Sequence, residues 1–96
     1  ESISAGLDYP GVSPIHCFLK DTNRARYTYA TDEDALRAYK IVTKFEKLNP
    51  SLEPSHAFAE AIKIAPRLSK DTIIIVNSCG DAEKDKDILK QRLGKY

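Results

Sequence analysis

The run Thr72-Ile73-Ile74-Ile75-Val76 restricts the possible folds of this chain more than any other segment. Successive β-branched residues favour an extended strand. Because neighbouring side chains of a strand point to opposite faces, this strand would need apolar cover on both of them. That requirement is typical of an inner strand in a parallel sheet that has helices on each side. The run therefore predicts an α/β protein.

The rest of the chain supplies one further strand and several helices. The aromatic and β-branched residues 26–30 predict a short strand. Thr31 is expected to cap a helix, because the acidic Asp34 follows three residues later. Helices are predicted over residues 15–20, 31–49, 54–66 and 84–93, after an irregular loop over residues 2–14. Two strands cannot bury residues 72–76 on both faces, so we expect residues 1–96 to be one segment of a larger α/β domain, incomplete on its own.

Three of the predicted helices carry an apolar stripe that we expect to be buried. The run 83–87, which alternates acids and lysines, is instead predicted to be a solvated helix start. The predicted buried residues are Leu36, Tyr39, Val42 and Phe45 in the second helix, Ala57, Phe58, Ala61, Ile62 and Ala65 in the third, and Ile88, Leu89 and Leu93 in the last.

Composition excludes several classes of protein. Fifteen Lys and Arg against fourteen Asp and Glu give a net charge of +1, which predicts no general attraction to nucleic acid or to an anionic membrane. No apolar run approaches the roughly 20 residues of a membrane helix. Cys17 and Cys79 are far apart and fit reduced thiols of a cytoplasmic protein better than a zinc site. The chain starts without Met or a signal peptide, so we expect it to begin inside a longer protein.

The loop 77–81 follows the strongest predicted strand, at the end where open α/β sheets bind ligands. It offers the hydroxyl of Ser78, the thiol of Cys79 and the flexible Gly80. The pattern is not specific, and a plain strand-to-helix turn is the alternative reading. Read without further context, Asp8 is a turn residue and Glu53 a helix N-terminal acid.

Four segments, in order and with conserved spacing, match one family. Residues 2–12 resemble a stretch of the tryptophan synthase β subunits almost letter for letter, and residues 31–38, 50–57 and 74–85 resemble further stretches. The resemblance implies a pyridoxal-phosphate enzyme of fold type II, with a three-layer αβα sheet domain. It also implies a lyase reaction in which L-serine and indole give L-tryptophan and water by β-replacement.

The resemblance also implies partners and missing parts. The family pairs two β chains and docks an α subunit or domain on each of them. Its Schiff-base lysine and its glycine-rich phosphate loop have no counterpart in this sequence. The isolated chain is therefore expected to be inactive.

Residue roles follow from the matched positions. Cys79 stands where the family has a serine that contacts the pyridine nitrogen of the cofactor, and Ser78 replaces it if the loop shifts by one residue. Gly80 keeps the family's glycine, and Glu53 matches a glutamate beside the cofactor ring. Asp81 departs from the family, which has an arginine there.

Three further positions lie in the first loop. Asp8 matches an aspartate that pairs with an arginine of the mobile domain when the site closes. Tyr9 and Gly11 match positions whose backbone carbonyls bind a monovalent cation.

Two other functions stay open at this point. One is a stand-alone, non-catalytic α/β module that binds a partner, which the missing upstream half favours. The other is a related pyridoxal-phosphate dehydratase, which Cys79 favours because some fold type II dehydratases resemble this chain in having cysteine there.

Overall fold

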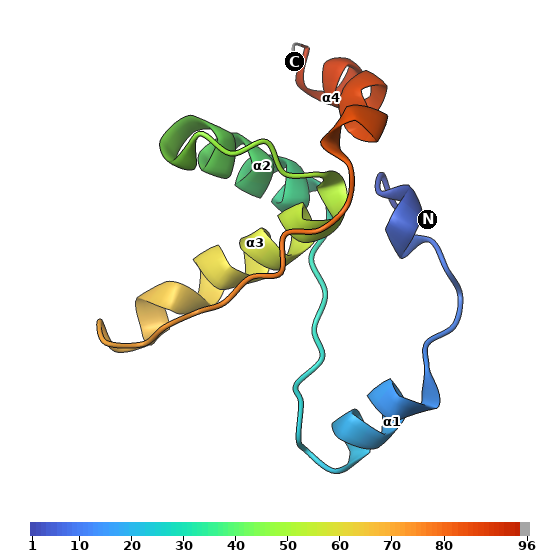
Figure 1. The fold of residues 1–96 in the computed structure, drawn as a ribbon, viewed down its shortest axis with the longest axis vertical. Helices are drawn as coiled ribbons and strands as arrows, with labels where there is room; N and C mark the ends of the chain where they lie inside the picture. The colour runs from blue at the N-terminus through green and yellow to red at the C-terminus, as the bar shows by residue number, and fades with distance from the viewer. Residues whose placement is uncertain (95–96) are drawn as a thin grey trace.

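The computed structural model describes residues 1–94, and within them the regular structure is entirely helical (Figure 1). No strand occurs in that range. The α-helices are α1 (Pro14–Asp21), α2 (Asp32–Glu46), α3 (Leu52–Ile64) and α4 (Lys86–Leu93), and short 3-10 turns lie at Ala5–Leu7, Ala65–Arg67 and Ala82–Asp85.

Capping residues set the helix starts, largely as predicted. The Ser13 hydroxyl accepts a hydrogen bond from the backbone N–H of Ile15, with Pro14 in the first turn of α1. Thr31 and Asp34 form a reciprocal capping box at the start of α2, which confirms that prediction. However, α2 ends at Glu46, before the predicted stop, because Lys47 adopts a left-handed conformation with a φ of 58°.

The core lies where α2, α3 and α4 meet. Its fully or nearly buried members are Leu36, Tyr39, Leu52 and Leu89. Side chains of the first residues and of α4 pack around this cluster, namely Ile3, Ile88 and Leu93. The predicted inward residues of α4 therefore all contribute to the core.

Two predicted apolar stripes are buried only in part. Phe45, at the end of α2, is 66% exposed although it was predicted to be buried. Along α3 the buried residues are Leu52, Pro54 and Ser55, whereas Ala57, Ala65 and Ile62 of the predicted stripe are exposed. Only residues of the first turn of α3 are therefore fully buried, because the hollows against α2 and the extended segments leave its later turns accessible.

Residues 26–30 and 72–76 are extended, but neither forms the predicted strand. A strand requires backbone pairing with a neighbouring strand along its length, and within residues 1–94 neither segment is paired in this way. Ile73 and Ile75 are 85% and 91% exposed. We call residues 26–30, residues 72–76 and the adjoining side of α3 the open face. The predicted α/β class is therefore not seen within residues 1–94.

Helix α1 lies apart from the other helices (Figure 1). None of its residues is buried, and Ile15 and Phe18 are largely exposed. A 2.8 Å hydrogen bond between His16 Nδ1 and the Tyr27 hydroxyl connects α1 to the extended segment 26–30. No helix within residues 1–94 is long and apolar enough to span a lipid bilayer.

Candidate functional site

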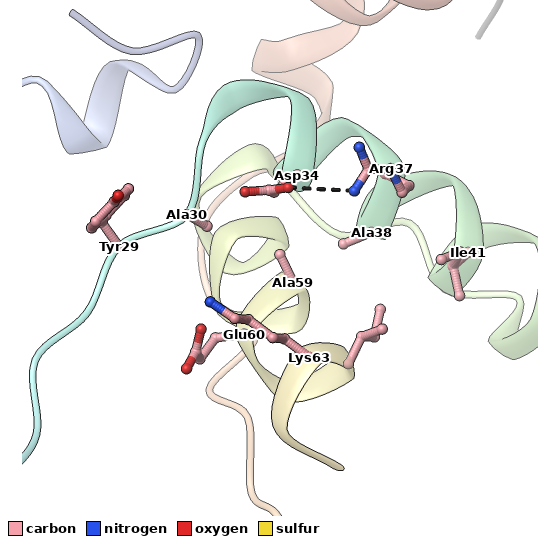
Figure 2. A pocket seen from close by; sticks show the side chains of 10 residues that line it. Tyr29, Ala30, Asp34, Arg37, Ala38, Ile41, Ala59, Glu60 and Lys63 are labelled. Carbon is pink, nitrogen blue, oxygen red and sulfur yellow. Dashed lines mark hydrogen bonds and ion pairs between the residues drawn. The ribbon is translucent and has the colours of Figure 1, made fainter. Parts of the chain in front are cut away.

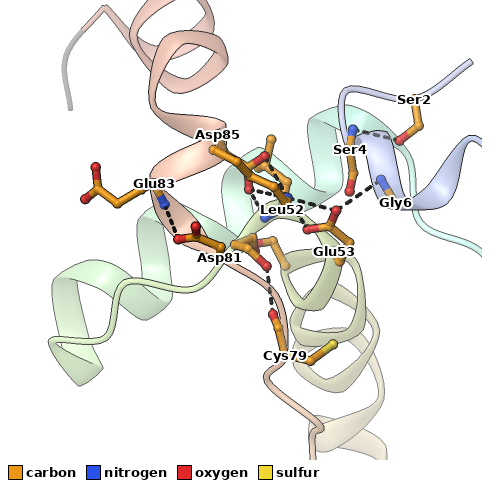
Figure 3. Close-up of polar contacts among 12 residues, drawn as sticks. Ser2, Ser4, Gly6, Leu52, Glu53, Cys79, Asp81, Glu83 and Asp85 are labelled. Carbon is orange, nitrogen blue, oxygen red and sulfur yellow. Dashed lines mark hydrogen bonds and ion pairs between the residues drawn. The ribbon is translucent and has the colours of Figure 1, made fainter.

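A cluster of polar groups joins three segments that are distant in sequence: residues 2–8, the start of α3, and residues 77–85 (Figure 3). We call this cluster the polar junction. Its members are Ser4, Gly6, Ser51, Glu53, Cys79, Gly80, Lys84 and Asp85.

Glu53 stands at the centre of the polar junction. The Lys84 ammonium donates to both of its carboxylate oxygens, at 2.8 and 2.7 Å. The backbone N–H of Gly6 donates to Glu53 Oε1 at 3.1 Å. The Glu53 side chain is 16% exposed, so this carboxylate is held by three contacts in a mostly buried position.

Asp85 connects Lys84 to the start of α3. Its Oδ2 accepts a hydrogen bond from the backbone N–H of Leu52 at 2.7 Å, which satisfies a donor that the helix leaves unpaired. Lys84 Nζ lies 3.0 Å from Asp85 Oδ1. Because Asp85 is only 2% exposed, the prediction that residues 83–87 form a solvated helix start is wrong at this residue.

These contacts shift two pKa values. Burial acts to raise the pKa of Glu53, but the hydrogen bonds that its carboxylate accepts, above all from Lys84, outweigh burial and lower that pKa to about 2. Burial acts to lower the pKa of Lys84, and the hydrogen bonds and charges of Glu53 and Asp85 raise it on balance. Both groups are therefore charged at neutral pH.

Two glycines permit this close approach of the three segments. Gly80 has a φ of +88°, and a Cβ there would lie 2.5 Å from Ser51 Oγ. A Cβ on Gly6 would lie 2.5 Å from Glu53 Oε1. The Ser51 hydroxyl in turn donates to the Cys79 carbonyl at 2.8 Å, which fixes the backbone just before Gly80.

The structure brings several of the predicted cofactor-facing residues together. Gly80 lies against Glu53, because a Cβ on Gly80 would be 3.4 Å from Glu53 Oε2. Cys79 precedes it with an exposed side chain, and Ser78 is exposed in the same loop. An ionised carboxylate, a thiol and a hydroxyl thus stand at one edge of the molecule, where they offer a ligand an acceptor, a weak donor and a group that both donates and accepts.

The predicted closure and cation residues make no described hydrogen bond or ion pair with Glu53, Cys79 or Gly80. Asp8 follows the first 3-10 turn, and its carboxylate is 3.7 Å from the Glu1 amine. Tyr9 is 79% exposed, and nothing lies within 4 Å of a Cβ built on Gly11. Within residues 1–94 no group of three or more His, Cys, Asp or Glu side chains is placed to hold a metal ion.

Sequence reasoning missed the parts played by Lys84, Asp85 and Ser51. Lys84 and Asp85 fall in a stretch that resembles the family, which was the available signal. Their alternating charges, however, resemble an ordinary wet helix start, and only the fold shows Asp85 against the start of α3.

The structure has a groove beside the polar junction and a separate hollow elsewhere on the surface. A groove of about 640 Å³ runs along the open face between the two extended segments and α3, and Glu53 and Asn77 reach its wall. A second hollow of about 340 Å³ lies between α2 and α3 (Figure 2). It contains the Asp34–Arg37 ion pair and none of the predicted site residues.

Comparisons with known proteins identify the origin of this arrangement. No family model matches the chain. The tryptophan synthase beta chains of Bordetella petrii and Cereibacter sphaeroides are each 52% identical to it over 93 residues, and that of Nitrosomonas europaea is 50% identical over 93 residues. Each match covers 97% of this chain and 23% of the relative. The chain is therefore homologous to one segment of the tryptophan synthase beta chain, a segment that makes up 23% of the length of these relatives.

Proposed function

We propose that this chain forms one wall of the active site of a pyridoxal-phosphate-dependent lyase that condenses L-serine and indole to L-tryptophan. The observation that carries the proposal is the 52% identity over 93 residues to tryptophan synthase beta chains. Because the chain spans 23% of those relatives, the reaction requires residues from the rest of a longer beta chain. The polar junction supports the proposal, since it gathers Glu53 and Gly80 at one edge beside the Cys79 loop.

The residues at this edge fit the ring end of the cofactor. Pyridoxal phosphate, when bound, supplies an electron sink for bonds at the substrate α-carbon. The Cys79 thiol would contact the pyridine nitrogen as a neutral hydrogen-bonding group, and Ser78 is the alternative. Gly80 has no side chain to obstruct the ring. Glu53 would border the ring as a carboxylate, because its pKa is held at about 2.

We further propose that the open face joins a sheet in the longer chain. The accessible surface of 7459 Å² exceeds the roughly 5,500 Å² typical of a folded protein of this mass. Much of the excess is apolar, as Ile73 and Ile75 illustrate. Pairing of residues 26–30 and 72–76 with further strands would satisfy their backbone groups and bury these side chains, which gives the three-layer αβα domain expected from the family resemblance.

Three further roles belong to the same proposal. Asp8 acts as a closure switch, and the carbonyls of Tyr9 and Gly11 bind a monovalent cation. The longer beta chain pairs with a second copy of itself and with a tryptophan synthase alpha subunit or domain, in the cytoplasm. The exposure of Tyr9 and Gly11 is compatible with contacts from outside this segment.

The test is product formation by the full chain, purified with pyridoxal phosphate and given L-serine with and without indole. We expect tryptophan when indole is present. We also expect the Cys79→Asp variant to make at least 10-fold less tryptophan. A carboxylate at this position would favour the protonated form of the ring nitrogen and so alter the cofactor's strength as an electron sink. Pyruvate from serine alone, with no tryptophan from the mixture, would instead identify a dehydratase. A chain that binds the cofactor yet makes neither product would contradict the proposal.

A further inference from the structure

We propose that Lys84 is a positioning residue that fixes the orientation of the Glu53 carboxylate, with Asp85 holding the Lys84 ammonium in place. This inference rests on the proposed function, in which Glu53 borders the cofactor ring. It assigns a role in the site to Lys84 and Asp85, for which the family resemblance gave none.

The geometry of the contact supports orientation rather than simple charge balance. Lys84 Nζ donates to both oxygens of Glu53, at 2.8 and 2.7 Å, so rotation of the carboxylate about its last bond lengthens at least one of the two contacts. The Gly6 N–H at 3.1 Å from Oε1 is a third restraint, from another segment. Without Lys84, the Gly6 N–H is the one contact from another segment that remains among those described for the Glu53 side-chain oxygens.

Asp85 prevents Lys84 from turning into solvent. Lys84 Nζ lies 3.0 and 3.2 Å from the two oxygens of Asp85. Asp85 is itself fixed, because its side chain is 3% exposed and accepts the Leu52 N–H at 2.7 Å. A lysine is ordinarily a flexible point charge on a long stem, and here two carboxylates restrict the Lys84 ammonium although its side chain is 38% exposed.

The arrangement also determines the chemical form of Glu53. An ionised carboxylate only accepts hydrogen bonds, whereas a protonated one also donates. Lys84 favours the ionised form, in agreement with the lowered pKa of Glu53. The edge beside Cys79 and Gly80 therefore presents an ionised, oriented acceptor at neutral pH.

The first experiment measures the pKa of Glu53 in the full chain, without substrate or cofactor. Carboxyl ¹³C NMR follows the titration in the wild type and in Lys84→Met, Lys84→Arg and Lys90→Met, and Glu53→Gln identifies the signal. We expect Lys84→Met to raise the pKa by about 1 to 2 units. Lys84→Arg should restore most of the shift, because arginine also donates to both oxygens. Lys90→Met, a change at an exposed lysine of α4, should leave the pKa unchanged.

The second experiment measures the pH dependence of kcat for serine–indole condensation in the same variants, loaded with pyridoxal phosphate. The acid limb of the profile should move to higher pH in Lys84→Met by about the NMR shift, and return in Lys84→Arg. An unchanged Glu53 pKa in Lys84→Met, or an equal shift in Lys90→Met, would overturn the role of Lys84. A shifted pKa in a chain whose wild type shows no condensation would instead overturn the proposed function.

Discussion

The polar junction and the open face differ in what they need from outside this segment. At the junction, Ser4, Ser51 and Asp85 are at most 2% exposed. The charged side chains of Glu53, Lys84 and Asp85 pair with one another there, and the Gly6 N–H adds a hydrogen bond from a third segment. On the open face, Ile73 and Ile75 are mostly exposed, and the extended backbone pairs with no strand within residues 1–94. The segment thus contains a polar cluster held by its own contacts and an apolar surface that remains exposed.

The contrast shows which interactions a segment of this kind carries within itself. The hydrogen bonds and ion pairs around the first turn of α3 join residues that all lie within 1–94. A two-sided apolar strand needs a sheet, and a sheet needs strands from elsewhere in the chain. The polar junction can therefore be ordered by residues 1–94 alone, whereas the proposed sheet cannot.

The strongest single disruption of the junction should be Asp85→Ala in the full chain. It leaves the buried Leu52 N–H without its acceptor and frees Lys84, so we expect a loss of about 3 kcal/mol in the free energy of unfolding. Asp85→Asn keeps an acceptor oxygen and should lose about 1 kcal/mol. Urea unfolding measures both, and equal stabilities of the alanine variant and the wild type would exclude the anchoring role of Asp85.

Acid should weaken the junction through Glu53. Its pKa of about 2 lies below the ordinary value of 4.5, so the ionised group stabilises the folded state above pH 4.5 and loses this contribution as the pH falls from 4.5 towards 2. A shift of this size corresponds to about 3 kcal/mol, at 1.36 kcal/mol per unit. The difference in unfolding free energy between wild type and Glu53→Gln should shrink over this window. A difference that is constant from pH 6 to pH 3 would show that Glu53 is not held as described.

A smaller effect is expected from the glycine pair Gly80 and Gly11. Gly80→Ala introduces a Cβ 2.5 Å from Ser51 Oγ at a positive φ and should cost about 1 to 3 kcal/mol. Gly11→Ala meets no atom within 4 Å and should change the free energy of unfolding by less than about 0.5 kcal/mol. Thermal unfolding measures the loss of stability in each variant. Similar losses at both positions would contradict the close approach of Gly80 to Ser51.

Local signals in the sequence predicted the helices well. Ser13–Pro14 and Thr31 with Asp34 mark helix starts through hydrogen bonds that reach only two or three residues along the chain. Leu36, Tyr39 and Leu89 were correctly placed in the core by their spacing. Glu53, Cys79 and Gly80 came from the family resemblance, and the structure brings Gly80 against Glu53 with Cys79 in the same loop.

The features that the sequence did not predict correctly depend on contacts between residues distant in the chain, which a local pattern does not contain. Residues 72–76 have a strand sequence, but strand formation depends on partners absent from residues 1–94. Phe45 continues an apolar stripe beyond the point where α2 is covered. Asp85 sits in a run of charges typical of a wet surface, and its burial depends on a contact with Leu52, 33 residues away.

Amide hydrogen exchange of the full chain measures the protection of the polar junction and of the open face in one experiment. The account predicts slow exchange at the Leu52 amide, which Asp85 holds, and equally slow exchange over residues 73–76, because a sheet in the longer chain covers the open face. Fast exchange over residues 73–76 beside a protected Leu52 would contradict the central claim that this segment is one wall of a larger α/β enzyme.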